Sequence, residues 1–285
     1  MTQAGSEARL RRTLGVGDAV VVGLGSMLGA GIFAALGPAA RAAGSGLLLG
    51  LAVAAVVAYC NAMSSARLAA VYPASGGTYV YGRERLGDFW GYLAGWSFVV
   101  GKTASCAAMA LTVGAYVWPG QAHAVAVAAV VALTAVNYGG VQKSAWLTRA
   151  IVAVVLAAPS RTTLAMARDR HLPGALAAVH PRFRVPHRAE LAVGAVVAVL
   201  AATVDVRGAI GFSSFGVLAY YAVANASAWT LSSAPVSRVV PVVGLVGCAV
   251  LAFALPVLSV GVGAAVLGVG AAAYGVRRWW AGRSG

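Results

Sequence analysis

Long apolar runs alternate with short polar connections along almost the whole chain. The hydrocarbon core of a bilayer is about 30 Å thick, and a helix needs about 20 apolar residues to cross it. Eight runs reach that length, and they cover residues 16–38, 46–69, 89–118, 121–140, 189–206, 208–232, 239–256 and 257–276. The pattern therefore predicts an all-α fold, a polytopic bundle of about eight transmembrane helices.

One further apolar run is too short to cross the membrane. Residues 150–160, "AIVAVVLAAPS", lie between Arg149 and Arg161 and contain Pro159, which ends a helix. The run has about half the length of a span, and basic residues flank it on both sides. We expect it to enter or lie on the inner leaflet without spanning it.

The composition agrees with a membrane location. Apolar residues make up 60% of the 285 residues, charged residues make up 10%, and the mean hydropathy is +0.83. No soluble domain of this size buries so much apolar surface. The polar start of the chain precedes a run longer than a signal-peptide core, so we expect the first span to be retained. The three cysteines all lie in apolar runs, which favours buried thiols over disulfides.

The net charge of +14 comes mainly from arginines in the connections between the apolar runs. With the N-terminus in the cytoplasm, 18 of the 21 Lys and Arg residues fall on the cytoplasmic side, Arg41 and Arg207 fall outside, and Lys102 lies within a span. The positive-inside rule therefore favours an inner-membrane protein with both termini in the cytoplasm. The basic loops favour anionic lipid headgroups, and no nucleic-acid partner is expected.

The first span contains the glycine-rich stretch "LGSMLGAGIFAALGP" at residues 24–38. Each glycine inside a helix costs about 1 kcal/mol relative to alanine, so the stretch weakens its own helix. One interpretation is close helix packing through the Gly25 and Gly29 pair. The other is that the helix unwinds at residues 29–31, so that the half-helix from Ile32 directs its backbone N–H groups at a carboxylate.

Four motifs in order resemble the amino acid–polyamine–organocation permeases, and most closely bacterial members related to cationic amino acid transporters. They are "GSMLGAGIF" (25–33), "YPASGGTYVYGRERLGDFWGYLAGW" (72–96), "NYGGVQKSAWLTR" (137–149) and "SRTTLAMARDRHLPGALAAVHPRFRVPHRAEL" (160–191). The resemblance covers nearly the whole chain. It implies two inverted five-helix repeats, with substrate held between the broken first and sixth helices.

The resemblance also implies a function and a set of site residues. The function is secondary active transport of amino acids or related amines, coupled to protons or sodium. The backbone of Gly29, Ala30 and Gly31 would bind the substrate carboxylate, and Met27 and Ile32 would lie beside the substrate. Residues 72–81 would form the cytoplasmic loop after the second span, with "SGG" in a tight turn and tyrosines as interfacial anchors or, less favoured, substrate contacts.

The chain departs from the family pattern at one place. Only about ten apolar residues separate the motif that opens the fifth family span from the motif that ends the eighth. This spacing predicts an internal deletion of about three transmembrane helices from a single membrane domain. The expected parts are the cytoplasmic N-terminus (1–15), helices 1–4 with the start of helix 5 (16–149), the short apolar segment with a basic loop (150–188), and helices resembling family spans 9–12 (189–285).

The deletion leaves three interpretations open. A transporter of the family is the leading one, although the second broken helix has no counterpart. A non-transporting membrane protein or partner subunit that keeps the scaffold is the alternative. A homo-oligomer in which two chains complete each other's site is the third.

Polar residues within the predicted spans offer a possible polar pathway formed by Lys102, Ser213, Ser214 and Asn225. Lys102 equally fits a side chain that extends to the cytoplasmic interface, and interhelical hydrogen bonding is the more frequent role of the others. The loop histidines have no cysteines or clustered carboxylates around them, so no metal site is expected. The sequence shows no nucleotide loop and no catalytic triad, so neither a cofactor nor enzyme activity is expected.

Overall fold

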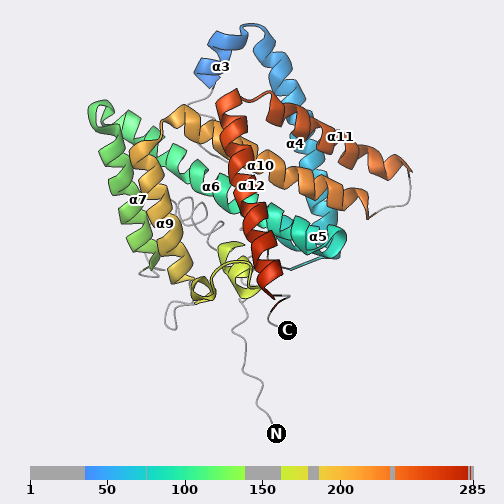
Figure 1. Cartoon of the computed structure of the whole chain (residues 1–285). Helices are drawn as coiled ribbons and strands as arrows, with labels where there is room; N and C mark the ends of the chain where they lie inside the picture. Colours follow the sequence, from blue (N-terminus) through green and yellow to red (C-terminus); the bar gives the residue numbers. More distant parts are fainter. Residues whose placement is uncertain are drawn as a thin grey trace.

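The computed structural model describes residues 36–74, 76–138, 162–178, 186–231, 235–281 and 283, and in these ranges it contains helices and turns without β-strands (Figure 1). The helices are α3 (Leu36–Ala43), α4 (Gly46–Val71), α5 (Thr78–Leu86), α6 (Asp88–Val117), α7 (Ala122–Tyr138), α9 (His187–Thr203), α10 (Val206–Trp229), α11 (Pro235–Phe253) and α12 (Val257–Ala281). Residues 162–168 form a further short helix, and Pro119–Gln121 and Gly174–Ala177 form single 3₁₀ turns.

Four of these helices are long and apolar enough to cross a membrane. They are Gly46–Val71, Asp88–Val117, Val206–Trp229 and Val257–Trp280. They coincide with four predicted spans, which confirms the helical membrane fold. The predicted spans 121–140 and 239–256 correspond to shorter apolar helices, and 189–206 corresponds to α9, which has 17 residues. Most of the predicted first span and all of residues 150–160 lie outside the described residues, so the count of eight spans and the inverted repeat stay predictions.

The centre of the bundle is the pair α6 and α10, whose backbones approach closely at two glycines. A Cβ atom placed on Gly216 would lie 3.0 Å from Cα of Gly101 and 3.0 Å from the carbonyl oxygen of Ser97. A Cβ atom on Gly101 would lie 3.2 Å from the carbonyl oxygen of Ser213. Small residues at a crossing allow helices in lipid to gain close van der Waals contact. This crossing therefore fixes the two helices around which the others pack.

The helices α7 and α9 pack side by side against the C-terminal half of α6 (Figure 1). Their shared core is built from aliphatic side chains, among them Ala107, Leu111, Ala126, Val130 and Val197. On the other side of α10, α4 and α11 pack against it. The bundle therefore has two flanks that meet at α6 and α10.

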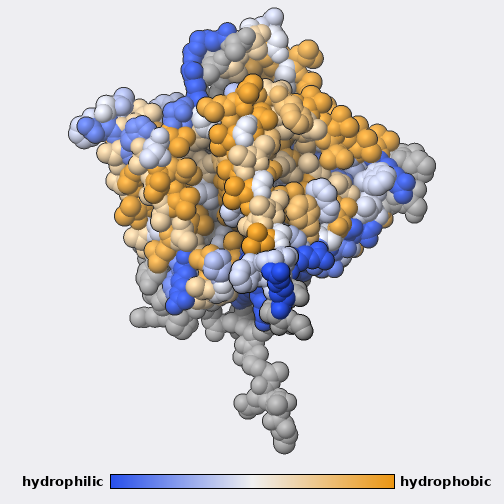
Figure 2. All heavy atoms as spheres, in the orientation of Figure 1, coloured by the Kyte–Doolittle hydropathy of each residue, from blue (hydrophilic) through white to orange (hydrophobic). Residues whose placement is uncertain are grey.

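The outer surface of the helices carries large apolar side chains. Leu48 on α4, Val199 on α9, Val246 on α11 and Val269 on α12 are all strongly exposed. Figure 2 shows this apolar surface covering the middle of the visible face, with the hydrophilic residues gathered towards its edges. Exposed apolar area of this extent fits contact with lipid, since water disfavours it.

Candidate functional site

The predicted carboxylate site lies outside the described residues. The first residue that the structure describes is Leu36, and all five site residues precede it: Met27, Gly29, Ala30, Gly31 and Ile32. The unwound first helix therefore stays a prediction. The four residues of the predicted polar pathway, in contrast, are all described.

Asn225 lies at the centre of a buried polar cluster in the flank formed by α4, α10 and α11. Its side chain is completely buried and accepts a hydrogen bond from the Ser64 hydroxyl at 2.7 Å. Its amide nitrogen donates to Asn61 Oδ1 at 2.6 Å and to the Tyr221 carbonyl at 2.9 Å. The Cys248 thiol also donates to Asn61 Oδ1, at 3.4 Å. The cluster thus connects three helices, which supports the interhelical interpretation of Asn225.

The polar cluster depends on a glycine of the facing helix. A Cβ atom on Gly244 of α11 would lie 2.4 Å from Asn225 Oδ1, which is closer than any non-bonded approach allows. Glycine at this position therefore lets α11 pack directly over the asparagine side chain. In the sequence this pairing corresponds to a polar residue in one span and a glycine in another. A single sequence does not show that the two residues are in contact.

The other residues of the predicted pathway lie away from Asn225. Ser213 is twelve residues earlier on α10, about 18 Å along the helix at 1.5 Å per residue. The hydroxyl of Ser214 donates to the Ile210 carbonyl of its own helix at 2.8 Å. Lys102 is half-buried on α6, next to the glycine crossing. The structure therefore does not bring Asn225 together with the other three, and a continuous polar pathway stays a prediction.

The two glycines of the predicted "SGG" turn form a turn, and Ser75 lies outside the described residues. Gly76 and Gly77 have φ angles of 131° and 55°, which favour glycine. The N–H of Thr78 donates to the Tyr220 hydroxyl of α10 at 3.2 Å, and a Cβ atom on Gly77 would lie 2.8 Å from that same oxygen. The turn therefore holds the start of α5 directly against α10.

Two of the three tyrosines in residues 72–81 are buried within the protein, and Tyr72 is partly exposed. Tyr79 is 1% exposed and Tyr81 is 7% exposed, so the interpretation of these two as interfacial anchors is wrong. The Tyr79 hydroxyl donates to the Asp169 carboxylate, and Arg83 Nη1 donates to the same carboxylate at 2.5 Å. Burial and the neighbouring carboxylate together raise the pKa of Tyr79. These contacts attach α5 to the segment that follows helix 162–168.

Sequence reasoning missed an aromatic cage around His171. The ring centroids of Tyr79, Tyr92 and Tyr274 lie 6.0, 5.4 and 5.8 Å from that of His171. Burial lowers the pKa of His171, the Asp169 carboxylate opposes this effect, and Arg277 adds to the lowering. The cage joins three helices to the 162–178 segment. In the parts of the chain that the structure describes, no group of three metal-ligating side chains is present.

Sequence reasoning also missed Glu190. Its side chain is 8% exposed, which makes it the only acidic residue buried to this degree in the described ranges. It lies in the first turn of α9, where the helix dipole favours a negative charge. A single acidic residue that follows three arginines and two histidines in "HPRFRVPHRAE" gave no signal of burial.

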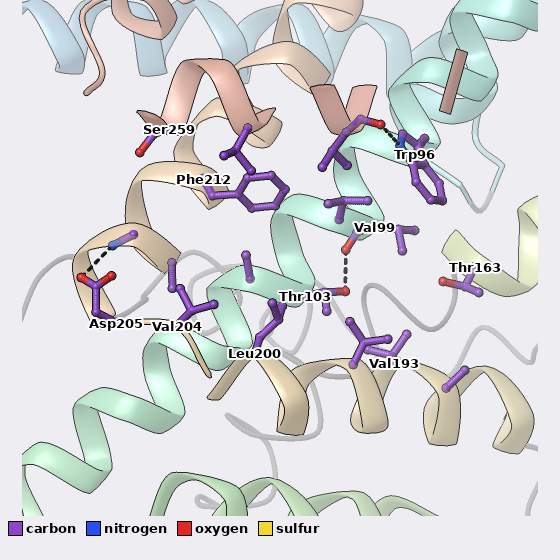
Figure 3. Close-up of a pocket in the computed structure, with 18 of the residues that line it drawn as sticks. Trp96, Val99, Thr103, Thr163, Val193, Leu200, Val204, Asp205, Phe212 and Ser259 are labelled. Carbon is purple, nitrogen blue, oxygen red and sulfur yellow. Dashed lines mark hydrogen bonds between the residues drawn. The ribbon is translucent and has the colours of Figure 1, made fainter. Parts of the chain in front are cut away.

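An apolar cavity of about 640 Å³ lies between α6, α9, α10 and α12 (Figure 3). Trp96, Val99 and Thr103 approach it from α6, and Leu200 and Phe212 approach it from α9 and α10. The Trp96 indole donates to the Val266 carbonyl of α12 at 2.9 Å, and the Thr103 hydroxyl donates to the Val99 carbonyl at 2.7 Å. Both polar groups are therefore hydrogen-bonded to backbone carbonyls of the protein.

A family model described as amino acid permease matches residues 18–155. An uncharacterized transporter of Mycobacterium tuberculosis is 56% identical over 404 residues, an alignment that covers 94% of this chain and 92% of that protein. The chain belongs to the amino acid–polyamine–organocation superfamily of permeases. The branched-chain amino acid permease BcaP of Bacillus subtilis is 35% identical over 94 residues, covering 33% of this permease and 20% of that one. Cationic amino acid transporter 4 of Homo sapiens is 34% identical over 95 residues, with coverage of 33% and 15%.

The permease is shorter than its mycobacterial relative. The alignment has 404 positions and this chain has 285 residues, so at least 119 positions (404 less 285) hold no residue of this chain. Because the alignment reaches nearly all of both proteins, these positions lie within the aligned region. The comparison therefore agrees with an internal deletion, while the identity of the missing helices stays a prediction.

Proposed function

We propose that this permease carries out secondary active transport of amino acids or related amines across the cell membrane. The observation that carries the proposal is the amino acid permease match over residues 18–155, which includes the complete glycine-rich stretch. BcaP and cationic amino acid transporter 4, whose names refer to amino acids, each align with about a third of this chain. The helical bundle with an apolar outer surface supports a membrane location for this activity.

The proposed substrate site is the backbone of Gly29, Ala30 and Gly31, with Met27 and Ile32 beside the substrate. Unpaired N–H groups at the start of a half-helix attract a carboxylate without a charged side chain. Such backbone is tolerated in a membrane only where it faces a cavity or a ligand. A proton or sodium gradient is the proposed energy source.

The side of this site that faces the first helix is unassigned, because the predicted internal deletion includes the helix that forms it in the family. In the family, the sixth helix faces the first across the substrate. A second copy of the chain would provide that wall in a homo-oligomer. A non-transporting membrane protein or partner subunit that keeps the scaffold is the alternative, and uptake measurements separate it from the proposal.

The test is uptake by purified protein in liposomes. A mixture of labelled amino acids is supplied with an imposed proton gradient, and separately with a sodium gradient. We expect uptake above that of protein-free liposomes, and we expect an ionophore to abolish it. Folded protein that takes up none of the twenty amino acids, and none of their decarboxylated amines supplied in the same way, under either gradient would contradict transport.

The proposed site is tested by Gly31→Leu. A leucine side chain would occupy the space of the substrate carboxylate, so we expect substrate binding to fall at least tenfold. Gly268→Leu on α12 is the matched control, because its Cβ meets nothing within 4 Å. Normal folding and normal binding of Gly31→Leu would leave the glycine with a packing role only.

A further inference from the structure

The described residues that line the cavity between α6, α9, α10 and α12 are none of those assigned to the proposed transport site. Its volume of about 640 Å³ falls within the usual range of ligand sites, roughly 300–1,000 Å³. Among the residues that the structure describes, the polar side chains on its wall besides the bonded Trp96 and Thr103 are Thr163, Asp205 and Ser259. Asp205 accepts hydrogen bonds from the backbone N–H groups of residues 207 and 208, as the N-cap of α10. This wall is therefore poorly suited to an amino acid, which brings both a carboxylate and an ammonium group.

The cavity reaches the outer surface of the protein between α9 and α12. Three of its lining residues, Val196 on α9 and Leu258 and Val262 on α12, are 51%, 79% and 45% exposed. Figure 2 shows that the surface over these two helices is largely apolar. The opening is thus continuous with the surface that faces lipid, and lipid is the apolar partner present at the highest concentration there.

The length of the cavity matches one layer of hydrocarbon. Its wall runs along α9 from Ala192 to Leu200, about 12 Å at 1.5 Å per residue, and continues past the end of the helix to Val204. Half of the bilayer core is about 15 Å thick. A single acyl chain lying along α9 therefore fits both the length and the apolar lining of the cavity.

Basic side chains lie at one end of this wall. Arg188 is exposed one turn before Ala192 on the same face of α9. Arg170 is exposed two residues before Leu172, which also lines the cavity. Positive charge at the end of an apolar cavity complements the phosphate of a phospholipid whose acyl chain occupies that cavity.

We propose that this cavity binds one acyl chain of an anionic membrane phospholipid, with the phosphate beside Arg188. The lipid inserts laterally between α9 and α12 and fills the space that the four helices leave. The site does not depend on the proposed transport function. It acts as a fixed lipid site that completes the packing of α9 and α12 against the α6 and α10 pair.

The test is lipid binding to the purified, delipidated protein, measured by native mass spectrometry. Phosphatidylglycerol, phosphatidylcholine and free palmitate are the three probes. We expect one phosphatidylglycerol to remain bound at collision energies that remove detergent. We expect Ala192→Phe to lower that bound fraction at least tenfold, because the ring occupies the cavity. Ala195→Phe is the matched control, because Ala195 is exposed on α9 and does not line the cavity.

A second variant tests the headgroup. Removing one basic residue near the surface weakens binding to anionic lipid about fivefold, so Arg188→Gln should lower phosphatidylglycerol binding by that factor and leave phosphatidylcholine binding unchanged. Thermal unfolding confirms that each variant is folded. Equal phosphatidylglycerol binding by Ala192→Phe and wild type, or retention of palmitate in preference to phosphatidylglycerol, would overturn the proposal.

Discussion

The polar cluster of α4, α10 and α11 yields a quantitative prediction of stability. Asn225 exchanges two side-chain hydrogen bonds with α4, through Asn61 and Ser64. Hydrogen bonds between helices in membrane proteins contribute about 0.6 kcal/mol on average and at most about 1.7 kcal/mol each. Replacing Asn225 with alanine should therefore lower the free energy of unfolding by about 1 to 3 kcal/mol.

The pairwise term is isolated by a double-mutant cycle of Asn61→Ala and Asn225→Ala. Each single variant loses the shared hydrogen bond and also creates a small cavity. The cost of the cavities enters both arms of the cycle and cancels, apart from relaxation around them. The remaining coupling should be about 0.6 to 1.7 kcal/mol in favour of the pair.

The assay is reversible unfolding in mixed micelles, monitored by circular dichroism as the mole fraction of sodium dodecyl sulfate rises. Thr112→Ala is the control, since the Thr112 hydroxyl is buried but donates to the Ala108 carbonyl of its own helix. Its coupling to Asn225→Ala should lie within the error of about 0.3 kcal/mol that holds for distant, independent sites. A coupling of Asn61 and Asn225 no larger than this control would refute the reasoning.

Two further predictions concern the His171 cage and the glycine crossing. Burial lowers the pKa of His171 in the folded protein below the unfolded value of about 6.5, so the unfolded state takes up the proton first as the pH falls. The thermal midpoint should therefore decrease as the pH falls below about 6.5, and His171→Leu should reduce that decrease; an unchanged pH profile in the variant would exclude the cage as its source. Gly216→Leu should separate α6 from α10 and lower the free energy of unfolding by about 1 to 3 kcal/mol. Gly268→Leu should change it little, because a Cβ atom on Gly268 meets nothing within 4 Å. Both variants are measured in the micelle assay. Equal effects of the two leucine variants would contradict the close crossing.

The spans were predictable because lipid imposes a simple rule on the chain. Every backbone polar group must be satisfied within its own helix, so length and hydropathy alone locate the segments. This rule found α4, α6, α10 and α12 to within three residues at nearly every end. It also placed α9 to within three residues at both ends, and it was least accurate at the C-terminal end of α12, where the helix continues from the predicted end at residue 276 to Ala281 through polar Arg277 and Arg278.

The contacts between helices were less predictable than the helices themselves. The "SGG" turn followed from local residue types, because positive φ angles favour glycine wherever they occur. The His171 cage instead joins Tyr79, Tyr92 and Tyr274, which lie about 80 to 100 residues away in the chain. No local sequence pattern predicts such long-range contacts, and a segment with a histidine near arginines looks like any other basic loop. Its burial becomes visible only when α5, α6 and α12 are placed together.

The specific polar contacts and the apolar cavity lie on different sides of the α6 and α10 pair. Asn225 and Tyr220 hold α4, α5 and α11 through directional hydrogen bonds, which fix one arrangement of that flank. On the α9 and α12 side, the wall from Ala192 to Val204 offers mainly dispersion contacts, which any chain of suitable shape satisfies. An amino acid needs directional donors for its carboxylate, and in this permease the proposed donors are the backbone groups of residues 29–31. The proposed binding of lipid at the cavity and the proposed binding of substrate at the first helix therefore depend on different interactions, so loss of one is not expected to abolish the other.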